Sequence, residues 1–160
     1  MRDAERRHTK AAARDAVGTL TDRELFLVGV ALYWAEGSKD KAWDRMEYLK
    51  LINSDPDVVT LHLRWLELLG VSRDRLRLQI SIHESADLEA AQQYWSDLTG
   101  VARTQFNKPV VKRHNPRTGR KNTGDTCRGC VAIYVRGSAD LYRRTEGAWY
   151  GIVLGAGPAT

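Results

Sequence analysis

The sequence predicts an α+β fold, because helical and strand-like hydrophobic patterns interleave along the 160-residue chain. A chain of this length usually forms one domain and can bury a sizeable core. We expect a polar helix or arm over residues 1–20, a single domain over residues 21–154 and a flexible tail over residues 155–160.

The first helix of this domain is expected to begin at Thr21. Thr21 and Glu24 fit the S/T-x-x-E capping box, in which each side chain satisfies a backbone amide of the other residue. The helix should run to Glu36 and stop at Gly37, the residue type that most easily adopts a left-handed conformation. Apolar residues fill nearly every position of residues 25–35, so we expect part of this helix to pack against another helix.

Short strand-like runs follow in residues 43–54. Asp55 as N-cap and Pro56 at the first helical position then predict a second helix, which Gly70 ends. The clearest strand of the chain covers residues 75–83, where large aliphatic residues alternate strictly with polar ones.

The second half of the chain continues this interleaving. A helix over residues 86–100 precedes a strand at residues 108–114 and a loop rich in turn formers at residues 115–124. Residues 130–137 alternate again, and a final helix is expected to begin near residue 138.

The excess positive charge is concentrated in one segment. The formal net charge is +5 and the pI is near 9.4, and residues 102–124 contain no acid. The cations of this segment are Arg103, Lys108, Lys112, Arg113, Arg117, Arg120 and Lys121. Such a local excess favours a polyanionic partner.

The chain is expected to be cytoplasmic and to have no membrane partner. No apolar run has the length of a membrane span, and the first residues alternate charge with alanine. In a reducing compartment the C-x-x-C of Cys127 and Cys130 is half a zinc site, a redox pair or two ordinary thiols. The lack of a second ligand pair in the sequence favours ordinary thiols.

The polar side of the strand at residues 75–83 has the chemistry of a base-reading surface. Its members are Arg75, Arg77, Gln79, Ser81 and His83. These residue types offer the donors and acceptors that distinguish base edges, and a two-stranded ribbon fits the major groove of DNA. An ordinary solvated sheet face is the alternative, and the basic segment favours nucleic acid.

Glu36 is a carboxylate at the end of a helix, where the partial negative charge of the helix disfavours an acid. Ala31 and Ala35 lie on one helical face, and small residues four apart let two helix backbones approach closely. If the partner is the same helix of a second chain, a two-fold axis brings two copies of Glu36 together, and Mg²⁺ would relieve their repulsion. The expected dimer interface comprises Val28, Ala31, Leu32 and Ala35.

Residues 29–37, GVALYWAEG, resemble the LAGLIDADG motif of homing endonucleases. The positions that match the motif or replace its residues conservatively are Ala31, Leu32, Tyr33, Ala35, Glu36 and Gly37. Gly29 replaces the leading leucine, and Trp34 replaces the first acid. Only the acid before the final glycine binds metal in that family, and Glu36 occupies its position.

The resemblance implies an order of helix, two strands, helix, two strands and helix, here with an extra helix at residues 87–98. It spans residues 21–153. It implies a saddle-shaped antiparallel sheet that has helices on one face and lies in the major groove of double-stranded DNA. Because the motif occurs once in the chain, it also implies a homodimer.

The resemblance further implies a site for Mg²⁺ or Mn²⁺ at Glu36 and Gly37, with basic residues around it. The expected catalytic residues are Glu36, Lys50 and Lys112. The expected nucleic-acid contacts are Lys39, Lys41, Arg75, Arg77, Gln79, Ser81, His83, Lys108, Lys112, Arg113, Arg117, Arg120 and Lys121.

Three functions are compatible with these patterns. The first is a site-specific, Mg²⁺-dependent double-stranded DNA endonuclease, which is homodimeric and hydrolyses phosphodiester bonds. The second is a DNA- or RNA-binding regulator or intron splicing factor that has the same fold and does not cut. The third is a small metal or redox module that uses Cys127 and Cys130.

Overall fold

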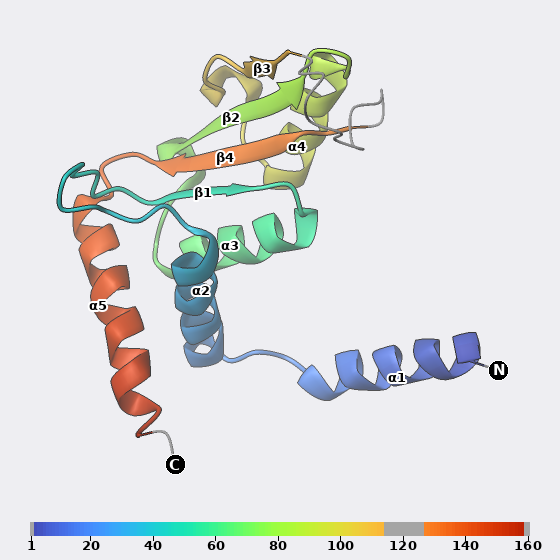
Figure 1. Cartoon of the computed structure of the whole chain (residues 1–160), viewed down its shortest axis with the longest axis vertical. Helices are drawn as coiled ribbons and strands as arrows, with labels where there is room; N and C mark the ends of the chain where they lie inside the picture. Colours follow the sequence, from blue (N-terminus) through green and yellow to red (C-terminus); the bar gives the residue numbers. More distant parts are fainter. Residues whose placement is uncertain (1, 114–126, 159–160) are drawn as a thin grey trace.

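The computed structural model describes residues 2–113 and 127–158 and confirms an α+β fold (Figure 1). These residues form five α-helices, two short 3₁₀-helices and a four-stranded sheet. The helices are α1 (Arg2–Val17), α2 (Asp22–Glu36), α3 (Pro56–Leu68), α4 (Leu88–Thr99) and α5 (Ala139–Gly155). The strands are β1 (Lys50–Asn53), β2 (Leu76–His83), β3 (Val110–Lys112) and β4 (Cys130–Val135), and the 3₁₀-helices are Arg73–Arg75 and Arg103–Gln105.

The capping box at the start of α2 is confirmed. The Glu24 amide donates a hydrogen bond of 3.2 Å to the Thr21 hydroxyl, and the Thr21 amide donates one of 2.7 Å to the Glu24 carboxylate. Gly37 follows the last residue of α2, but its φ of −75° is extended and not left-handed, so that part of the prediction is wrong. Glycine fits there for a different reason, because a Cβ atom would come within 2.5 Å of the Tyr33 ring.

Gly29, which replaces the leading leucine of the motif, lies where α2 meets α3. A Cβ atom on Gly29 would lie 2.0 Å from the side chain of Trp65. Trp65 itself is fully buried and cannot move aside without opening the core. The close approach of these two helices therefore explains a glycine at this position.

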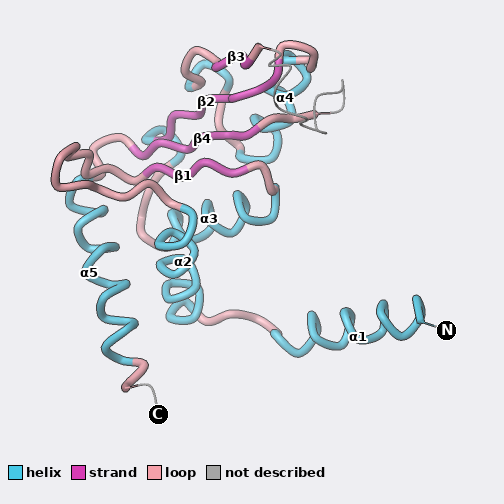
Figure 2. The backbone as a smooth tube through the Cα atoms, viewed as in Figure 1, coloured by secondary structure: helices cyan, strands magenta, loops and turns pink. Residues whose placement is uncertain are grey.

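The sheet has the strand order β1-β4-β2-β3 and is mixed (Figure 2). Strand β4 pairs antiparallel with β1 and with β2, whereas β3 runs parallel to β2. The expectation of a fully antiparallel sheet is therefore wrong at the β3 edge. The cause is α4, because a helical crossover after β2 brings the chain back so that the next strand runs in the same direction.

One strand, β1, separates α2 from α3, where the resemblance implied two. The residues before it form a loop, with isolated bridges between Gly37 and Leu51 and between Lys41 and Asp44. The order of elements expected from homing endonucleases is thus not reproduced element by element in the described residues.

The alternation along β2 decides which face of the sheet is covered. Leu76, Leu78, Ile80 and Ile82 are at most 2% exposed, and the residues between them are half-buried. The same core contains side chains of α2, α3, α4 and α5. Burial of each large aliphatic side chain contributes roughly 1.5–3 kcal/mol, which fixes the four helices on this face and leaves the other face of the sheet uncovered by them.

His62 of α3 is buried in this core without a hydrogen-bond partner. The side chain is 0% exposed, and within the described part of the chain neither ring nitrogen makes a hydrogen bond. Its ring centroid lies 6.1 Å from that of Tyr33 and 5.6 Å from that of Trp65. Burial lowers the pKa of His62 to about 3, so the folded protein holds a neutral imidazole.

We predict that acid destabilises the fold through His62. In the unfolded chain the imidazole binds a proton below about pH 6.5, whereas in the folded chain it does so only near its lowered pKa of about 3. The stabilisation is therefore complete above pH 6.5 and is lost as the pH falls, with a loss of about 2 kcal/mol at about pH 5.

Urea unfolding at pH 7 and pH 5 measures this loss. His62→Leu should remove most of the pH dependence, and His8→Leu on the exposed side of α1 should retain it. Equal pH dependence in the wild type and in His62→Leu would contradict the role of His62.

Candidate nucleic-acid interface and carboxylate site

Glu36 is exposed at the end of α2, and a lysine of the same chain compensates the charge of that helix end. The Lys39 ammonium donates hydrogen bonds of 2.8 Å to the carbonyl oxygens of Trp34 and Gly37. A cation bound to the last carbonyls offsets the negative end of the helix dipole. The Gly37 carbonyl, expected as a metal ligand, accepts a hydrogen bond from Lys39 in this structure.

The buried Tyr33 joins the end of α2 to β1. Its hydroxyl donates a hydrogen bond of 2.7 Å to the Ser38 carbonyl and accepts one of 3.2 Å from the Lys50 amide. Burial raises the pKa of Tyr33, so the hydroxyl stays protonated and keeps donating at any ordinary pH. Glu36 is therefore held at the edge of the sheet that β1 forms.

A single chain does not hold a complete metal site in the described residues. No group of three or more His, Cys, Asp or Glu side chains is placed there to bind one ion. The Glu36 carboxylate suits a hard divalent cation and makes no ion pair within residues 2–113 and 127–158. A complete set of carboxylate ligands at Glu36 would therefore need a second chain.

The expected dimer interface lies on the surface of α2. Val28 is 40% exposed, Ala31 and Ala35 are exposed, and Leu32 is half-buried. The buried residues of α2 are Gly29, Val30 and Tyr33, which face the rest of the protein. The exposed stripe ends one residue before Glu36.

The apolar surface continues from α2 onto α5, which sequence reasoning did not identify. Trp34 stacks on Trp149 of α5 with a centroid distance of 6.1 Å and an interplanar angle of 8°. Beyond this contact, Tyr150, Val153 and Leu154 are 59%, 51% and 82% exposed. Their spacing at i, i+3 and i+4 along the last helix was the available signal.

Strand register places the predicted base-reading residues together on the side of the sheet away from the core, which we call the open sheet face. Its residues are Lys50 and Ile52 of β1, Cys130, Ala132 and Tyr134 of β4, Arg77, Gln79, Ser81 and His83 of β2, and Val110 and Lys112 of β3. Tyr134 was missed, although it alternates with Val131, Ile133 and Val135 as the polar residues of β2 alternate with its core residues.

Four of the expected base-reading side chains make hydrogen bonds within the protein. Arg77 donates hydrogen bonds of 2.9 Å and 2.7 Å to the carbonyls of Asp74 and Leu76, and a ring nitrogen of His83 lies 2.8 Å from the Ser85 hydroxyl. Arg75 lies before β2, in the 3₁₀-helix, and its guanidinium donates to the carbonyls of Arg136 and Gly137. Its expected place on the strand is therefore wrong. Gln79 donates a hydrogen bond of 2.9 Å to the Lys108 carbonyl and accepts one of 3.1 Å from the Tyr134 hydroxyl. Base recognition by Gln79 would use its second amide hydrogen.

The structure separates the two lysines that were expected at one catalytic site. The backbone of Lys50 lies beside the end of α2, because its carbonyl accepts a hydrogen bond of 2.8 Å from the Ser38 amide. The Lys50 ammonium lies 4.8 Å from the centre of the Tyr134 ring. Lys112 lies in β3, at the opposite edge of the sheet. Three strand spacings amount to about 14 Å, so Lys50 and Lys112 do not lie at one site within a single chain.

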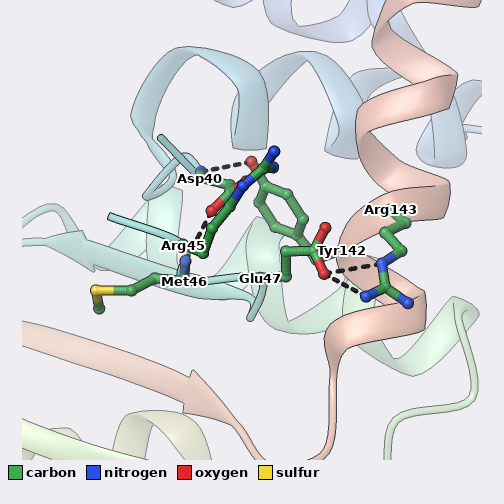
Figure 3. Close-up of polar contacts among 6 residues, drawn as sticks. All are labelled: Asp40, Arg45, Met46, Glu47, Tyr142 and Arg143. Atoms are coloured by element: carbon green, nitrogen blue, oxygen red, sulfur yellow. Dashed lines mark hydrogen bonds and ion pairs between the residues drawn. The ribbon is translucent and has the colours of Figure 1, made fainter. Parts of the chain in front are cut away.

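The loop between α2 and β1 is tied to α5 through Asp40 (Figure 3). The Asp40 carboxylate accepts hydrogen bonds of 2.7 Å from the Met46 amide and 2.6 Å from Arg45, and the Asp40 amide donates one of 2.7 Å to the Tyr142 hydroxyl. The bond from Met46 lowers the pKa of Asp40 most, followed by the interaction with Arg45. The neighbouring pair of Glu47 and Arg143 makes a second tie.

This loop presents two of the expected nucleic-acid contacts. Lys39 is committed to the end of α2, whereas the Lys41 ammonium lies 5.9 Å from the centre of the Trp43 ring. Trp43 is 83% exposed at the tip of the loop and was not identified from the sequence. The loop adds an aromatic ring and a cation beside the edge strand β1.

The basic segment is described only in part. Lys108, Lys112 and Arg113 are exposed at the β3 edge, whereas the expected contacts Arg117, Arg120 and Lys121 lie outside the described residues. Cys127 and Cys130 are half-buried free thiols and form no disulfide.

No protein-family model matches this chain, and no curated protein matches it either. Among the described helices, none combines the length and the apolarity needed to cross a lipid bilayer. The geometry of α2 and of the open sheet face is therefore the basis for inferring a function.

We predict that Lys39→Met destabilises the protein through the end of α2. The substitution keeps an unbranched side chain but removes the cation and both hydrogen bonds to carbonyls, so the free energy of unfolding should fall by about 1 kcal/mol. Lys41→Met is the matched control, since its ammonium bonds no helix carbonyl, and it should stay within about 0.5 kcal/mol of wild type in urea unfolding. Equal effects of the two substitutions would show that the Lys39 contacts do not stabilise α2.

Proposed function

We propose that this protein is a homodimeric DNA-binding protein that hydrolyses phosphodiester bonds of double-stranded DNA with Mg²⁺ held by Glu36 of both chains. The observation that carries the proposal is the exposed stripe of small and apolar residues on α2 that leads directly to the exposed Glu36. Within the described part of a single chain, the Glu36 carboxylate makes no ion pair.

The stripe on α2 fits a second copy of itself. Alanine at residues 31 and 35 permits close contact of two helix backbones, and the exposed apolar side chains of α5 would extend the buried area. A two-fold axis through this contact brings the two Glu36 carboxylates to the same place. Two clustered carboxylates favour a divalent cation with oxygen ligands.

The open sheet face supports DNA as the substrate. Arg77, Lys50 and the exposed Lys112 of this face contribute cations, and Ser81 contributes a hydroxyl. Cations hold the phosphate backbone, and polar side chains on a strand read base edges in the major groove.

A bound divalent ion at Glu36 would supply a nucleophilic water and stabilise the leaving oxygen. The residues of this chain would position the ion and the DNA. Glu36 is exposed and fits such an ion, whereas the Gly37 carbonyl would become a ligand only after Lys39 releases it. Lys50, on the strand next to the end of α2, would stabilise negative charge at the phosphate.

The second candidate function is DNA or RNA binding without cleavage, as in a regulator or an intron splicing factor. The position of Lys39 favours it, because an ammonium ion already neutralises the helix end where a metal is expected. The open sheet face serves this function equally well.

Dimerisation through α2 predicts that Ala31→Lys yields a monomer. A charged side chain on the contact face would clash with the second helix and remain buried without a partner. Light scattering at micromolar concentration should give the mass of a dimer for the wild type and of a monomer for this variant. Ala12→Lys, an equivalent change on the exposed α1, should remain dimeric. A monomeric wild type, with and without DNA, would refute the interface.

The cleavage proposal predicts that Glu36→Gln loses activity and keeps its fold. Incubation of a randomised double-stranded DNA library with Mg²⁺ should show specific cuts by the wild type and a rate reduced by roughly 100-fold or more in the variant. Asp22→Asn, at the other end of α2, is the control and should cut at the wild-type rate. If the wild type binds DNA but does not cut it, the cleavage proposal is contradicted and the second candidate function, binding without cleavage, is favoured.

A further inference from the structure

The helix α1 carries its positive charge on one side. With 100° per residue, Arg2, Arg6, Lys10, Arg14 and Arg7 fall within an arc of about 140°. We call this arc the basic face of α1. Of the acidic residues of the helix, Asp3 lies within the arc near its first turn, whereas Glu5 and Asp15 lie on the opposite side.

Packing against the rest of the protein does not stabilise α1. α1 buries no side chain in its 16 residues, and it leaves the body at the end of α2 that is farther from the sheet (Figure 1). Five alanines give it high intrinsic helix propensity. An isolated helix of this length is nevertheless marginal in water, so binding along one side would stabilise it.

In the described part of the chain, few acidic side chains pair with the cations of the basic face. Within the described residues the one ion pair of α1 joins Arg14 to Asp15 at 2.8 Å, and both side chains are highly exposed. The other four cations of the face make no ion pair in residues 2–113 and 127–158. Successive cations at i and i+4 are about 6 Å apart along the helix axis, which gives a linear row of charge.

The opposite side of α1 excludes a lipid surface as the preferred partner. A helix that lies on a membrane buries large apolar residues such as leucine, phenylalanine or tryptophan. The opposite side of α1 has alanines, His8, Thr9 and two acids instead. A row of cations without an apolar face matches the phosphate backbone of a nucleic acid, which is bound through charge alone.

We propose that the basic face of α1 is a second nucleic-acid-binding surface, which holds the phosphate backbone independently of base sequence and of the open sheet face. Because α1 lies at the far end of α2 from the sheet, the two surfaces contact different stretches of nucleic acid. This inference does not require cleavage at Glu36.

The test measures binding of two unrelated fluorescein-labelled 30-base-pair DNA duplexes by anisotropy over a range of NaCl concentrations. The test variant is the full chain with Arg6→Gln, Arg7→Gln and Lys10→Gln. The charge-matched control carries Arg23→Gln, Arg64→Gln and Arg144→Gln, all at exposed positions outside both surfaces. A fourth protein with Lys50→Gln and Arg77→Gln reports on the open sheet face.

Loss of three phosphate contacts should weaken the binding of both duplexes alike, by roughly tenfold or more at 0.1 M salt. It should also reduce the slope of log K against log salt by about 3. The charge-matched control should keep the wild-type slope. Because α1 buries nothing, the thermal midpoint of the test variant should not change. This result supports the proposal even if the sheet variant binds as the wild type does.

Three results would overturn the proposal. In the first, the test variant and the wild type have the same slope, while the sheet variant loses affinity, which leaves the open sheet face as the DNA surface. In the second, the wild type binds neither duplex, which removes the proposed function as well. In the third, the wild type binds vesicles that contain 30% phosphatidylserine, and the test variant changes binding to these vesicles but not to DNA.

Discussion

The packing around Tyr33 fixes the geometry on which the candidate site depends. This side chain is 0% exposed, and its ring lies 6.0 Å from Trp65 and 6.4 Å from Tyr142 between centroids. Its hydroxyl bonds Ser38 and Lys50. One buried tyrosine thus connects α2 with α3, α5 and β1, and it determines where the chain leaves α2. The exposed position of Glu36 beside the edge strand follows from that arrangement.

Charge compensation at the end of α2 explains how an acid is tolerated there. Lys39 turns back onto the helix carbonyls, so the fold needs no external cation to be stable. In the proposed function, a divalent ion would have to replace the Lys39 ammonium at the Gly37 carbonyl. The two candidate functions differ in which of these cations occupies the helix end when DNA is bound.

Features that depend on neighbours in sequence were predicted well. The capping box of Thr21 and Glu24 and the alternation of β2 involve residues within one turn or one strand, and both are confirmed. The extended conformation of Gly37 was not predictable, because the Tyr33 ring that excludes a Cβ atom is positioned by the buried Trp65 and Tyr142. The parallel β3 and the separation of Lys50 from Lys112 depend on strand order, which local patterns do not contain.

The faces on which the candidate residues lie were predictable from the sequence, whereas the contacts of their side chains were not. The exposed stripe on α2 followed from helical spacing, and the open sheet face followed from alternation. The commitment of Gln79 to Tyr134 and Lys108 could not be foreseen, because these partners come from two other segments of the chain. The anchoring of the loop by Asp40 similarly requires Tyr142, which is 102 residues away in sequence.

If two copies of α2 meet so that their Glu36 ends are adjacent, spin labels at residue 36 of the two chains lie close together, and an electron spin distance measurement would detect this. A nitroxide on Glu36→Cys, in a chain with Cys127→Ser and Cys130→Ser, would report the separation between the two chains. Contacting helix axes lie about 8–10 Å apart, so we expect a narrow distribution of spin–spin distances below about 20 Å. A distribution beyond about 40 Å, or no interaction between the spins, would contradict the paired site.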